Sequence, residues 1–385
     1  MIIRQVIPKL QEMATKFPVL TVTGPRQSGK TTVCKQTFSD YRYVSLENPD
    51  DRLFAEEDPR GFLEEYNSKV IIDEAQNVPQ LFSYIQGIVD ESQQMGQFIL
   101  TGSQNFLLLK KISQSLAGRV YIFHLLPLNY SEIDQDYPQD LENSIFKGGY
   151  PAIYDRKLSA EDFFPSYIQT YIERDVRSIV QVKDLNLFSN FLKLCAGRTG
   201  QLFNASALGN ELGIDYKTVQ NWLSVLQTSF IIFLLQPWHE NFNKRIVKTP
   251  KLYFYDSGLA AYLLGIKDFD EVNFHFAKGA LFENYVITEY IKNLRNLGNN
   301  KMPYFWRDSN GNEIDMLSNF GKNMKIVEMK SGKTINMSFF KGLDYFEKIQ
   351  QGYELERFLV YGGNQNRKQK NTQILAWNKI DEIAN

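Results

Sequence analysis

The sequence has little cysteine and little histidine. Two cysteines, Cys34 and Cys195, and three histidines occur in 385 residues, and the histidines lie far apart along the chain. A disulfide framework needs more cysteines than this, and a zinc site needs cysteine or histidine ligands at short, regular spacing. The composition therefore excludes both kinds of cross-link, and we expect the two cysteines to be thiols of the hydrophobic core.

Long hydrophobic runs and an excess of charge of either sign are also missing. The longest apolar run, residues 230–235, is far shorter than the ~20 residues that cross a bilayer, and the first residues lack the layout of a signal peptide. The formal net charge of −1 excludes a globally basic nucleic-acid-binding protein, although it is compatible with a local basic patch. We therefore expect a cytoplasmic globular protein with no membrane partner.

One loop near the start fits a phosphate-binding pattern. Residues 24–31, Gly-Pro-Arg-Gln-Ser-Gly-Lys-Thr, match G-x-x-x-x-G-K-[ST]. Residues 19–23 before it are apolar and β-branched, which is typical of a buried strand, and the residues after it can begin a helix. The alternative is a chance match, and this strand, loop and helix context speaks against it. The residues expected to bind ATP are Gly24, Pro25, Arg26, Gln27, Ser28, Gly29, Lys30, Thr31 and Thr32.

The residue types of this loop have physical roles in binding a nucleotide. Gly24 and Gly29 let backbone N–H groups approach the β-phosphate closely, and the N-terminus of the following helix adds the positive end of its dipole. We expect Lys30 to neutralise the β- and γ-phosphates and Thr31 to bind Mg²⁺. The loop therefore predicts ATP and Mg²⁺ as cofactors.

A pair of acidic residues follows a second apolar run. Residues 69–72, Lys-Val-Ile-Ile, lead into Asp73 and Glu74, and such a strand delivers carboxylates to the carboxyl edge of a parallel sheet, where ligands bind. We expect Asp73 to hold Mg²⁺, directly or through water. Glu74 is expected to orient and deprotonate the water that attacks the γ-phosphate. Taken without the loop, the pair is equally explained as solvated surface at a strand end.

Further strand candidates predict an α/β domain. Residues 41–46, 97–102 and 120–123 have strand character and are separated by helical segments, and this alternation predicts a three-layer core with a mainly parallel sheet. Ser103 follows residues 97–102 and lies level with the acids if the sheet is parallel, so its hydroxyl can touch the γ-phosphate or the water. A serine that begins a helix as its N-cap explains the same residue equally well.

The chain resembles a known family, the AAA-type P-loop ATPases of bacteria and archaea whose loop reads Gly-Pro-Arg-Gln-Ser-Gly-Lys-Thr-Thr and continues into a domain of unknown function. The resemblance implies that Ser103 is a sensor residue and that Arg119 is an arginine finger or phosphate sensor. A finger that acts on a neighbouring subunit implies a homo-oligomer. An arginine one step before a strand is otherwise usually a surface residue. The similarity covers nearly the whole chain and rests on residues 24–32, 71–76, 100–103, 116–119, 171–176 and 251–256.

The middle of the chain predicts two further parts. Residues 128–186 lose the strand alternation and carry aromatic residues at helical spacing, which indicates a helical subdomain. Residues 187–256 predict three helices and then two strands, an arrangement typical of a winged helix. A winged helix used for protein contacts is the alternative, because the helix expected to read bases, residues 216–226, has one lysine balanced by Asp215. The candidate contacts to DNA phosphates, without sequence specificity, are Lys244, Arg245, Lys248 and Lys251.

The last part, residues 257–385, contains a second group of candidate site residues. A predicted helix carries Glu283, and the second strand of a predicted hairpin carries Asp315. On the next strand, Glu328 and Lys330 project to the same face, because strand side chains alternate. This arrangement resembles the PD-(D/E)XK nuclease superfamily, with Ile314 in place of the proline. The resemblance implies that the acids bind Mg²⁺ and that the lysine positions the attacking water.

Two functions follow from these patterns. In the first, a Mg²⁺-dependent AAA-type ATPase couples ATP turnover to DNA binding or processing. In the second, the chain is a nucleotide-driven switch or scaffold whose later parts bind partners without cleavage. The alternative to a metal site in the last part of the chain is a solvated hairpin in which Lys330 pairs with a carboxylate. The predicted fold is α/β, with a three-layer core at residues 1–127, a helical subdomain at 128–186, a winged helix at 187–256 and an α/β nuclease-like domain at 257–385.

Overall fold

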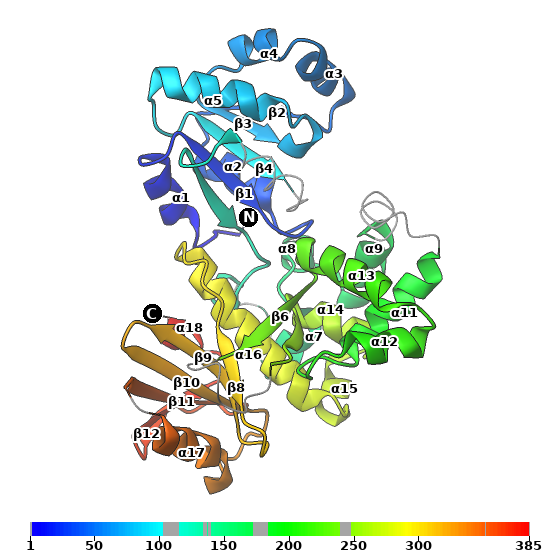
Figure 1. The fold of residues 1–385 in the computed structure, drawn as a ribbon, viewed down its shortest axis with the longest axis vertical. Helices are drawn as coiled ribbons and strands as arrows, with labels where there is room; N and C mark the ends of the chain where they lie inside the picture. Colours follow the sequence, from blue (N-terminus) through cyan, green and yellow to red (C-terminus); the bar gives the residue numbers. More distant parts are fainter. Residues whose placement is uncertain are drawn as a thin grey trace. The chain divides into compact units, whose positions relative to one another are not determined.

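The structure, a computed structural model, divides into two compact units (Figure 1). Unit 1 contains Met1–Leu128, Thr228–Phe230 and Arg295–Asn300, and unit 2 contains Asn129–Gln227, Ile231–Leu294 and Lys301–Asn385. The residues that the structure describes are 2–102, 115–133, 137, 140–171, 184–238, 248–350 and 352–384.

Unit 1 is built on a five-stranded sheet in the order β2-β3-β4-β1-β5. Every pair of neighbouring strands is parallel, which confirms the α/β fold with a parallel sheet. The central strand, β4, is buried along its whole length, as expected for a strand covered on both faces. The strands are β1 (Val19–Thr23), β2 (Arg42–Ser45), β3 (Val70–Asp73), β4 (Phe98–Gly102) and β5 (Val120–His124).

Two hydrophobic clusters cover the two faces of this sheet. Leu20 and Val22 point to the face that packs against α1 and α2, whereas Val19 points to the opposite face, because side chains alternate along a strand. Helices therefore lie on both sides, giving three layers. The helices of unit 1 are α1 (Ile7–Ala14), α2 (Lys30–Thr37), α3 (Pro49–Glu57), α4 (Pro59–Glu65), the 3₁₀ turn η1 (Ala75–Asn77) and α5 (Leu81–Ser92).

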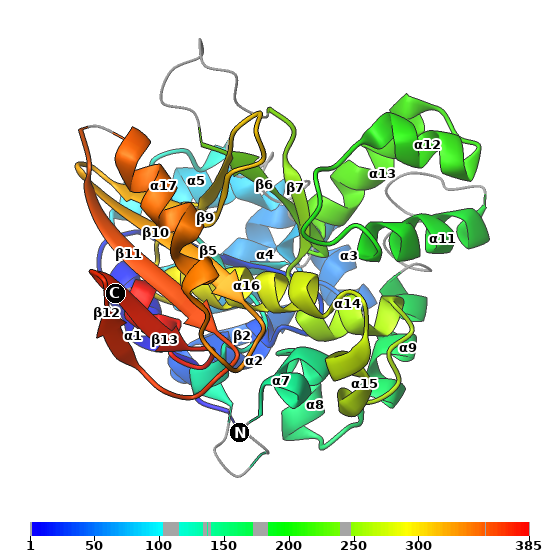
Figure 2. The ribbon, with the colours of Figure 1, turned by 90° about the horizontal axis from the view of Figure 1, so that it is seen from below.

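Unit 2 contains an eight-stranded mixed sheet in the order β12-β13-β11-β10-β9-β8-β6-β7 (Figure 2). The hairpin of β6 and β7 joins this sheet through parallel pairing of β6 with β8, where Gln236 lies opposite Tyr304. The two strands expected to form a wing are thus strands of the same sheet as residues 304–376. The strands are β6 (Ile232–Pro237), β7 (Lys251–Phe254), β8 (Tyr304–Arg307), β9 (Glu313–Phe320), β10 (Asn323–Lys330), β11 (Glu354–Tyr361), β12 (Arg367–Gln369) and β13 (Thr372–Ala376).

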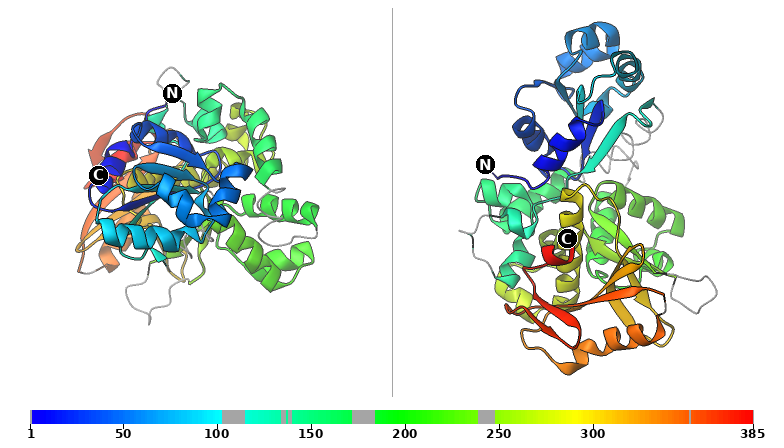
Figure 3. Two further views of the ribbon diagram at one scale, coloured as in Figure 1. Left: turned by 90° about the horizontal axis from the view of Figure 1, so that it is seen from above. Right: turned by 90° about the vertical axis from the view of Figure 1, so that its left-hand side faces the viewer.

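Helices pack around the sheet of unit 2. Leu343 and Phe346 of the orange helix α17 bury against the side chains of β8 to β10, which places α17 along the sheet (Figure 3, right). Among the described helices, none has the length and hydropathy needed to cross a bilayer. The helical elements are η2 (Tyr130–Glu132), α7 (Leu141–Lys147), α8 (Pro151–Asp155), α9 (Ala160–Tyr171), α11 (Leu185–Ala196), α12 (Ala205–Leu212), α13 (Tyr216–Thr228), α14 (Ser257–Leu263), α15 (Phe269–Phe274), α16 (Lys278–Asn296), η4 (Met337–Phe340), α17 (Lys341–Ile349) and α18 (Asp381–Ala384).

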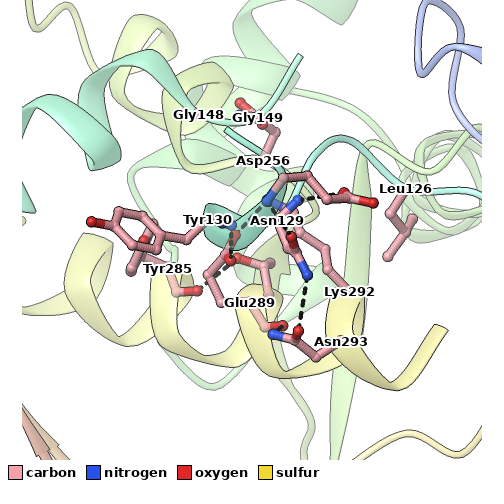
Figure 4. A network of polar contacts seen from close by, with 12 residues as sticks. Leu126, Asn129, Tyr130, Gly148, Gly149, Asp256, Tyr285, Glu289, Lys292 and Asn293 are labelled. Atoms are coloured by element: carbon pink, nitrogen blue, oxygen red, sulfur yellow. Dashed lines mark hydrogen bonds and ion pairs between the residues drawn. The ribbon is translucent and has the colours of Figure 1, made fainter. Parts of the chain in front are cut away.

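A buried polar network joins α16 to the start of unit 2 (Figure 4). The carboxylate of Glu289 accepts a hydrogen bond from the backbone N–H of Tyr130 at 2.7 Å and pairs with Lys292 at 2.8 Å. The side chain of Asn129 donates to Asn293 at 2.8 Å. These groups are buried and hydrogen-bonded to one another, so the network specifies where residues 129–130 meet α16.

Asp256 is a second buried junction in the same region. One of its oxygens caps α14 by accepting from the N–H of Leu259 at 3.0 Å, and the other accepts from the N–H of Gly149 at 2.7 Å. Burial raises the pKa of this carboxyl group. Neighbouring Gly148 has no room for a side chain, because a Cβ would lie 2.1 Å from the Asp256 carboxylate. Asp256 therefore ties the segment after α7 to the start of α14.

The replacement Asp256→Ala tests this junction. It leaves two buried N–H groups without their acceptor, so we expect the free energy of unfolding to fall by about 3 kcal/mol. The matched control is Asp268→Ala, which removes the exposed N-cap of α15 and its bond to the N–H of Glu271, and which is expected to cost about 1 kcal/mol. Urea unfolding of both variants measures the difference. Equal losses would contradict the role given to Asp256.

Candidate nucleotide site and a second carboxylate cluster

The loop after β1 has the backbone that its glycines predict. A Cβ at Gly24 would lie 2.1 Å from the backbone oxygen of Leu125, so only glycine fits this position. Gly29 has φ of +90° and directly precedes the first residue of α2, and an L side chain is strained in that conformation. The loop therefore turns sharply from β1 into the N-terminus of α2, where anions are stabilised.

Lys30 is buried inside this loop. Its ammonium donates to the backbone oxygens of Gly24 at 3.1 Å and Pro25 at 2.8 Å, and 6% of the residue is exposed. Burial lowers the pKa of Lys30 to about 8, although the nearby carboxylates of Glu74 and Asp73 oppose the shift. The ammonium is thus held inside the loop by two backbone oxygens, and phosphate oxygens can replace them as acceptors when a nucleotide binds.

The carboxylate of Asp73 joins three segments at the carboxyl edge of the sheet. It accepts hydrogen bonds from the hydroxyls of Thr31 at 3.0 Å, Tyr43 at 2.9 Å and Thr101. Burial, together with the charge of Asp73, raises the pKa of Tyr43 to about 12. The structure brings together the two predicted Mg²⁺ ligands, Thr31 and Asp73.

Tyr43 and Thr101 are site residues that were not predicted from the sequence. Thr101 belongs to β4, and β3 pairs with β4 up to Ile72 and Leu100, so Asp73 and Thr101 come next in the same register. A weak signal was present, since Thr101 is the polar residue at the end of an apolar strand. Its contact with Asp73 depends on the order of the strands.

Glu74 lies directly after β3, where the chain turns away from the sheet. Its backbone is left-handed, with φ of +52°, and it precedes η1. The side-chain amide of Gln76 donates to its carboxylate. Glu74 is therefore next to Asp73, the predicted Mg²⁺ ligand, but lies outside the strand, a position that suits its predicted role as a base acting on a water beyond the γ-phosphate.

The residues of this edge fit Mg²⁺ and ATP. The hydroxyl of Thr31 and the carboxylate of Asp73 are the hard oxygen ligands that Mg²⁺ prefers. Within the described part of the chain, the buried hydroxyl of Ser28 in the loop has no hydrogen-bond partner, which is unusual for a buried polar group. A phosphate oxygen in the loop is a suitable acceptor for it.

Two other residues predicted for the nucleotide site, Ser103 and Arg119, are not among the contacts described above. Ser103 lies outside the described residues. Arg119 pairs with Asp90 of α5, with 2.8 Å between its terminal nitrogen and one carboxylate oxygen, and also donates to the backbone oxygen of Ala117. The ion pair is partly exposed and raises the pKa of Arg119. Its role as a finger or sensor stays a prediction.

The described basic residues that were expected to contact DNA differ in burial. Lys244 and Arg245 lie outside the described residues, and Lys248 is exposed. Lys251 is 3% exposed and pairs with the carboxylates of Glu283, at 2.9 Å, and Glu313. The prediction that Lys251 contacts a DNA phosphate is therefore wrong, because its ammonium is already buried among protein carboxylates.

The four residues of the second candidate site lie close together in unit 2. The ammonium of Lys330 is 2.8 Å from Glu328 and 3.5 Å from Asp315, and Asp315 accepts from the backbone N–H of Met329 at 2.7 Å. Burial and the neighbouring Asp315 raise the pKa of Glu328 to about 8. Glu283 comes from α16, and burial, together with the carboxylate of Asp315, raises its pKa.

Three further residues belong to this cluster and were not predicted. Lys251 and Tyr253, both of β7, donate to Glu283. Glu313 precedes Asp315 by two residues, so strand alternation, which was used for Glu328 and Lys330, could also have placed it on the same face. Glu283, Glu313 and Asp315 each offer an oxygen within 4.8 Å of the others. We call the four carboxylates Glu283, Glu313, Asp315 and Glu328 the carboxylate cluster.

Three family models match successive parts of the chain. Residues 16–134 match an AAA domain, residues 138–270 match a domain of unknown function (DUF8612), and residues 278–380 match a second domain of unknown function (DUF4143). Residues 16–134 are thus similar to AAA domains. This AAA domain contains the loop, Asp73 and Glu74, and it supports ATP binding and hydrolysis in general.

Relatives that match more than four fifths of the chain occur in bacteria and archaea. An uncharacterised protein of Mycobacterium tuberculosis is 29% identical over 340 residues, which cover 87% of this chain and 75% of the relative. An uncharacterised protein of Methanocaldococcus jannaschii is 25% identical over 346 residues, which cover 81% and 74%. Among solved structures, a Walker-type ATPase of Pyrococcus abyssi is 15% identical with a TM-score of 0.45, covering 67% of this chain and 94% of its own.

Replacement of Lys30 by alanine tests the loop of the AAA domain. Loss of the buried ammonium removes the cation expected beside the phosphates, so we expect ATP affinity to fall by about 100-fold. The control is Lys16→Ala, which removes an exposed lysine that pairs with Glu12 and is expected to leave ATP affinity unchanged. Calorimetric titration with ATP and Mg²⁺ measures both. ATP affinity retained in Lys30→Ala would overturn the assignment of the loop.

Proposed function

We propose that this protein binds ATP with Mg²⁺ at the loop of its AAA domain and hydrolyses the γ-phosphate with Glu74 as general base. The observation that carries this proposal is the hydrogen bond between Thr31 and Asp73. It brings the two expected Mg²⁺ ligands together at the edge of the sheet, beside the buried Lys30. Bound Mg²⁺ supplies charge neutralisation between the β- and γ-phosphates.

Each residue then has a separate part in turnover. Lys30 stabilises the negative charge of the phosphates, and Asp73 orients Thr31 through their hydrogen bond. Glu74 takes the proton of the attacking water, and Ser103 is proposed to position that water or the γ-phosphate. Arg119 is proposed as a finger for a neighbouring subunit, a role that requires it to leave the ion pair with Asp90.

The replacement Glu74→Gln separates binding from hydrolysis. The amide keeps the shape of the side chain but cannot accept the proton, so we expect turnover to fall by about 100-fold or more while ATP affinity is kept. The control Glu64→Gln changes an exposed residue of α4 and is expected to turn over normally. Phosphate release in a single turnover, with nucleotide titration alongside, measures the effect. Turnover at the control rate would remove Glu74 from its role.

We further propose that ATP turnover is coupled to DNA binding by the middle of unit 2. Helices α12 and α13 are joined at Gly213, which has φ of +69°, and Asp215 caps α13 by accepting from the N–H of Thr218 at 3.0 Å. This compact turn between two helices, together with the exposed Lys248 that precedes β7, supports contact with a phosphate backbone. Cytoplasmic location stays a prediction.

The second candidate function is a nucleotide-driven switch or scaffold that binds partners without cleavage. Lys251 favours it, because its ammonium is buried against Glu283 and Glu313, two carboxylates that a metal-dependent nuclease would leave for a cation. Both functions share the ATPase step, and they differ in whether nucleic acid is bound by the later parts of the chain.

Salt dependence of DNA binding distinguishes the two functions. If Lys244, Arg245 and Lys248 contact phosphates, the slope of log affinity against log salt is expected to be roughly −3, at about −0.9 per phosphate, for any DNA sequence. Lys248→Glu should flatten the slope by about 1, whereas the control Lys267→Glu, at an exposed site after α14, should not. The ATPase rate with and without DNA completes the experiment. Absence of binding and of stimulation would favour the switch.

A further inference from the structure

The position of Lys251 gives the carboxylate cluster a role different from metal binding. Its ammonium lies 2.9 Å from an oxygen of Glu283 and makes a close ion pair with Glu313. Glu283 and Glu313 are two of the three carboxylates whose oxygens come within 4.8 Å of one another, and Asp315 is the third. An internal cation therefore already contacts the acids that would have to bind a divalent ion.

We propose that the ammonium of Lys251 takes the place of a divalent cation in the carboxylate cluster, so that the cluster is neutralised from within and holds no metal. A hard cation binds carboxylate oxygens at roughly 2.0–2.6 Å. A divalent ion shared by these acids would lie beside the ammonium, and the repulsion between two cations in a largely buried site is large. The residues present therefore do not fit a nuclease metal ion, and no cleavage step is assigned to them.

The charge balance of the cluster supports this proposal. Four carboxylates pair with three cations, so side chains of the protein itself neutralise most of the negative charge of the group. The cations besides Lys251 are Lys330, which contacts Asp315 and Glu328, and Arg307, which is 3.0 Å from Glu313. Removal of Lys251 would take an ion pair from both Glu283 and Glu313, which are two of the three carboxylates that come closest together.

The backbone around Lys251 keeps its side chain in this position. On one side, β7 pairs with β6, where Lys251 lies opposite Leu235. On the other side, the turn after α11 runs along β7, and the N–H of Gly200 donates to the oxygen of Leu252 at 2.8 Å. This pairing fixes the backbone of Lys251, and its side chain is 4% exposed, so its ammonium lies among the carboxylates and not in solvent.

Other segments cover the cluster on two sides. The turn at Gly200 lies over Glu283, because a Cβ at Gly200 would be 3.7 Å from its carboxylate. The first turn of α17 lies over Glu328, and a Cβ at Gly342 would be 2.0 Å from that carboxylate. Among the four carboxylates and their three cations, the side chains of Arg307 and Lys330 are the most exposed. The carboxylates are thus closed in by cations and backbone.

Binding of Mn²⁺ to the full-length protein tests the proposal. All proteins carry Asp73→Asn, which removes the Mg²⁺ ligand of the nucleotide site, and ATP is left out. We expect no saturable site tighter than about 0.1 mM in this parent, and a gain of at least tenfold in Mn²⁺ affinity in Lys251→Met. The control Lys322→Met removes an exposed lysine between β9 and β10 and should behave as the parent. Electron paramagnetic resonance of free Mn²⁺ measures each protein.

A double variant shows whether the Mn²⁺ site gained in Lys251→Met lies in the carboxylate cluster. Adding Asp315→Asn to Lys251→Met should abolish the gain, because it removes a ligand of the cluster. A Mn²⁺ site in the parent that Asp315→Asn removes would overturn the proposal, as would Lys251→Met with the affinity of the parent. If Lys251→Met does not fold, Lys251→Gln, which keeps a hydrogen-bond donor without the charge, takes its place. The measurement on the parent decides even if neither variant folds.

Discussion

The hydrogen bonds to the Asp73 carboxylate are the interaction on which the nucleotide edge depends. Three hydroxyls converge on it, from α2, β2 and β4. Because the carboxylate is buried, each of these bonds is stronger than it would be in water, and an unpaired charge there would be costly. The loop residue Thr31 is thereby held to the sheet as well as to its own helix. The arrangement expected of a magnesium site therefore depends on the order of the strands that bring these hydroxyls to Asp73.

The loop and its two acids could be predicted because each is a short continuous stretch that acts through its own backbone and its own strand. The parallel sheet was predicted from the alternation of strands and helices, and the pairings confirm it. Thr101 and Tyr43 could not be predicted in the same way. A hydroxyl at a strand end is ordinary, and its contact with Asp73 depends on the order β2-β3-β4, which is a property of the whole sheet.

In the carboxylate cluster, too, some contacts could be predicted from the sequence and others could not. Strand alternation placed Glu328 and Lys330 on one face, and the structure brings them to Asp315. The prediction for Lys251 was wrong because a run of cations describes local composition, whereas burial depends on partners elsewhere in the chain. Its partner Glu283 lies 32 residues later, on a helix. Nothing in residues 241–251 indicates that one of their four cations is buried and pairs with a carboxylate from a distant part of the chain.

The parallel pairing of β6 with β8 has a consequence for how this protein can be divided or exchanged in evolution. A fragment that ended at residue 256 would keep the hairpin but lose the strand beside it, and Lys251 would lose both carboxylates with which it pairs. A fragment that began after residue 256 would expose the edge of β8, and Glu283 and Glu313 would lose their ion pairs with Lys251. Residues 138–270 and 278–380 match two separate family models, yet in this chain they share a sheet and an ion pair. Exchange of either segment alone would remove one side of both.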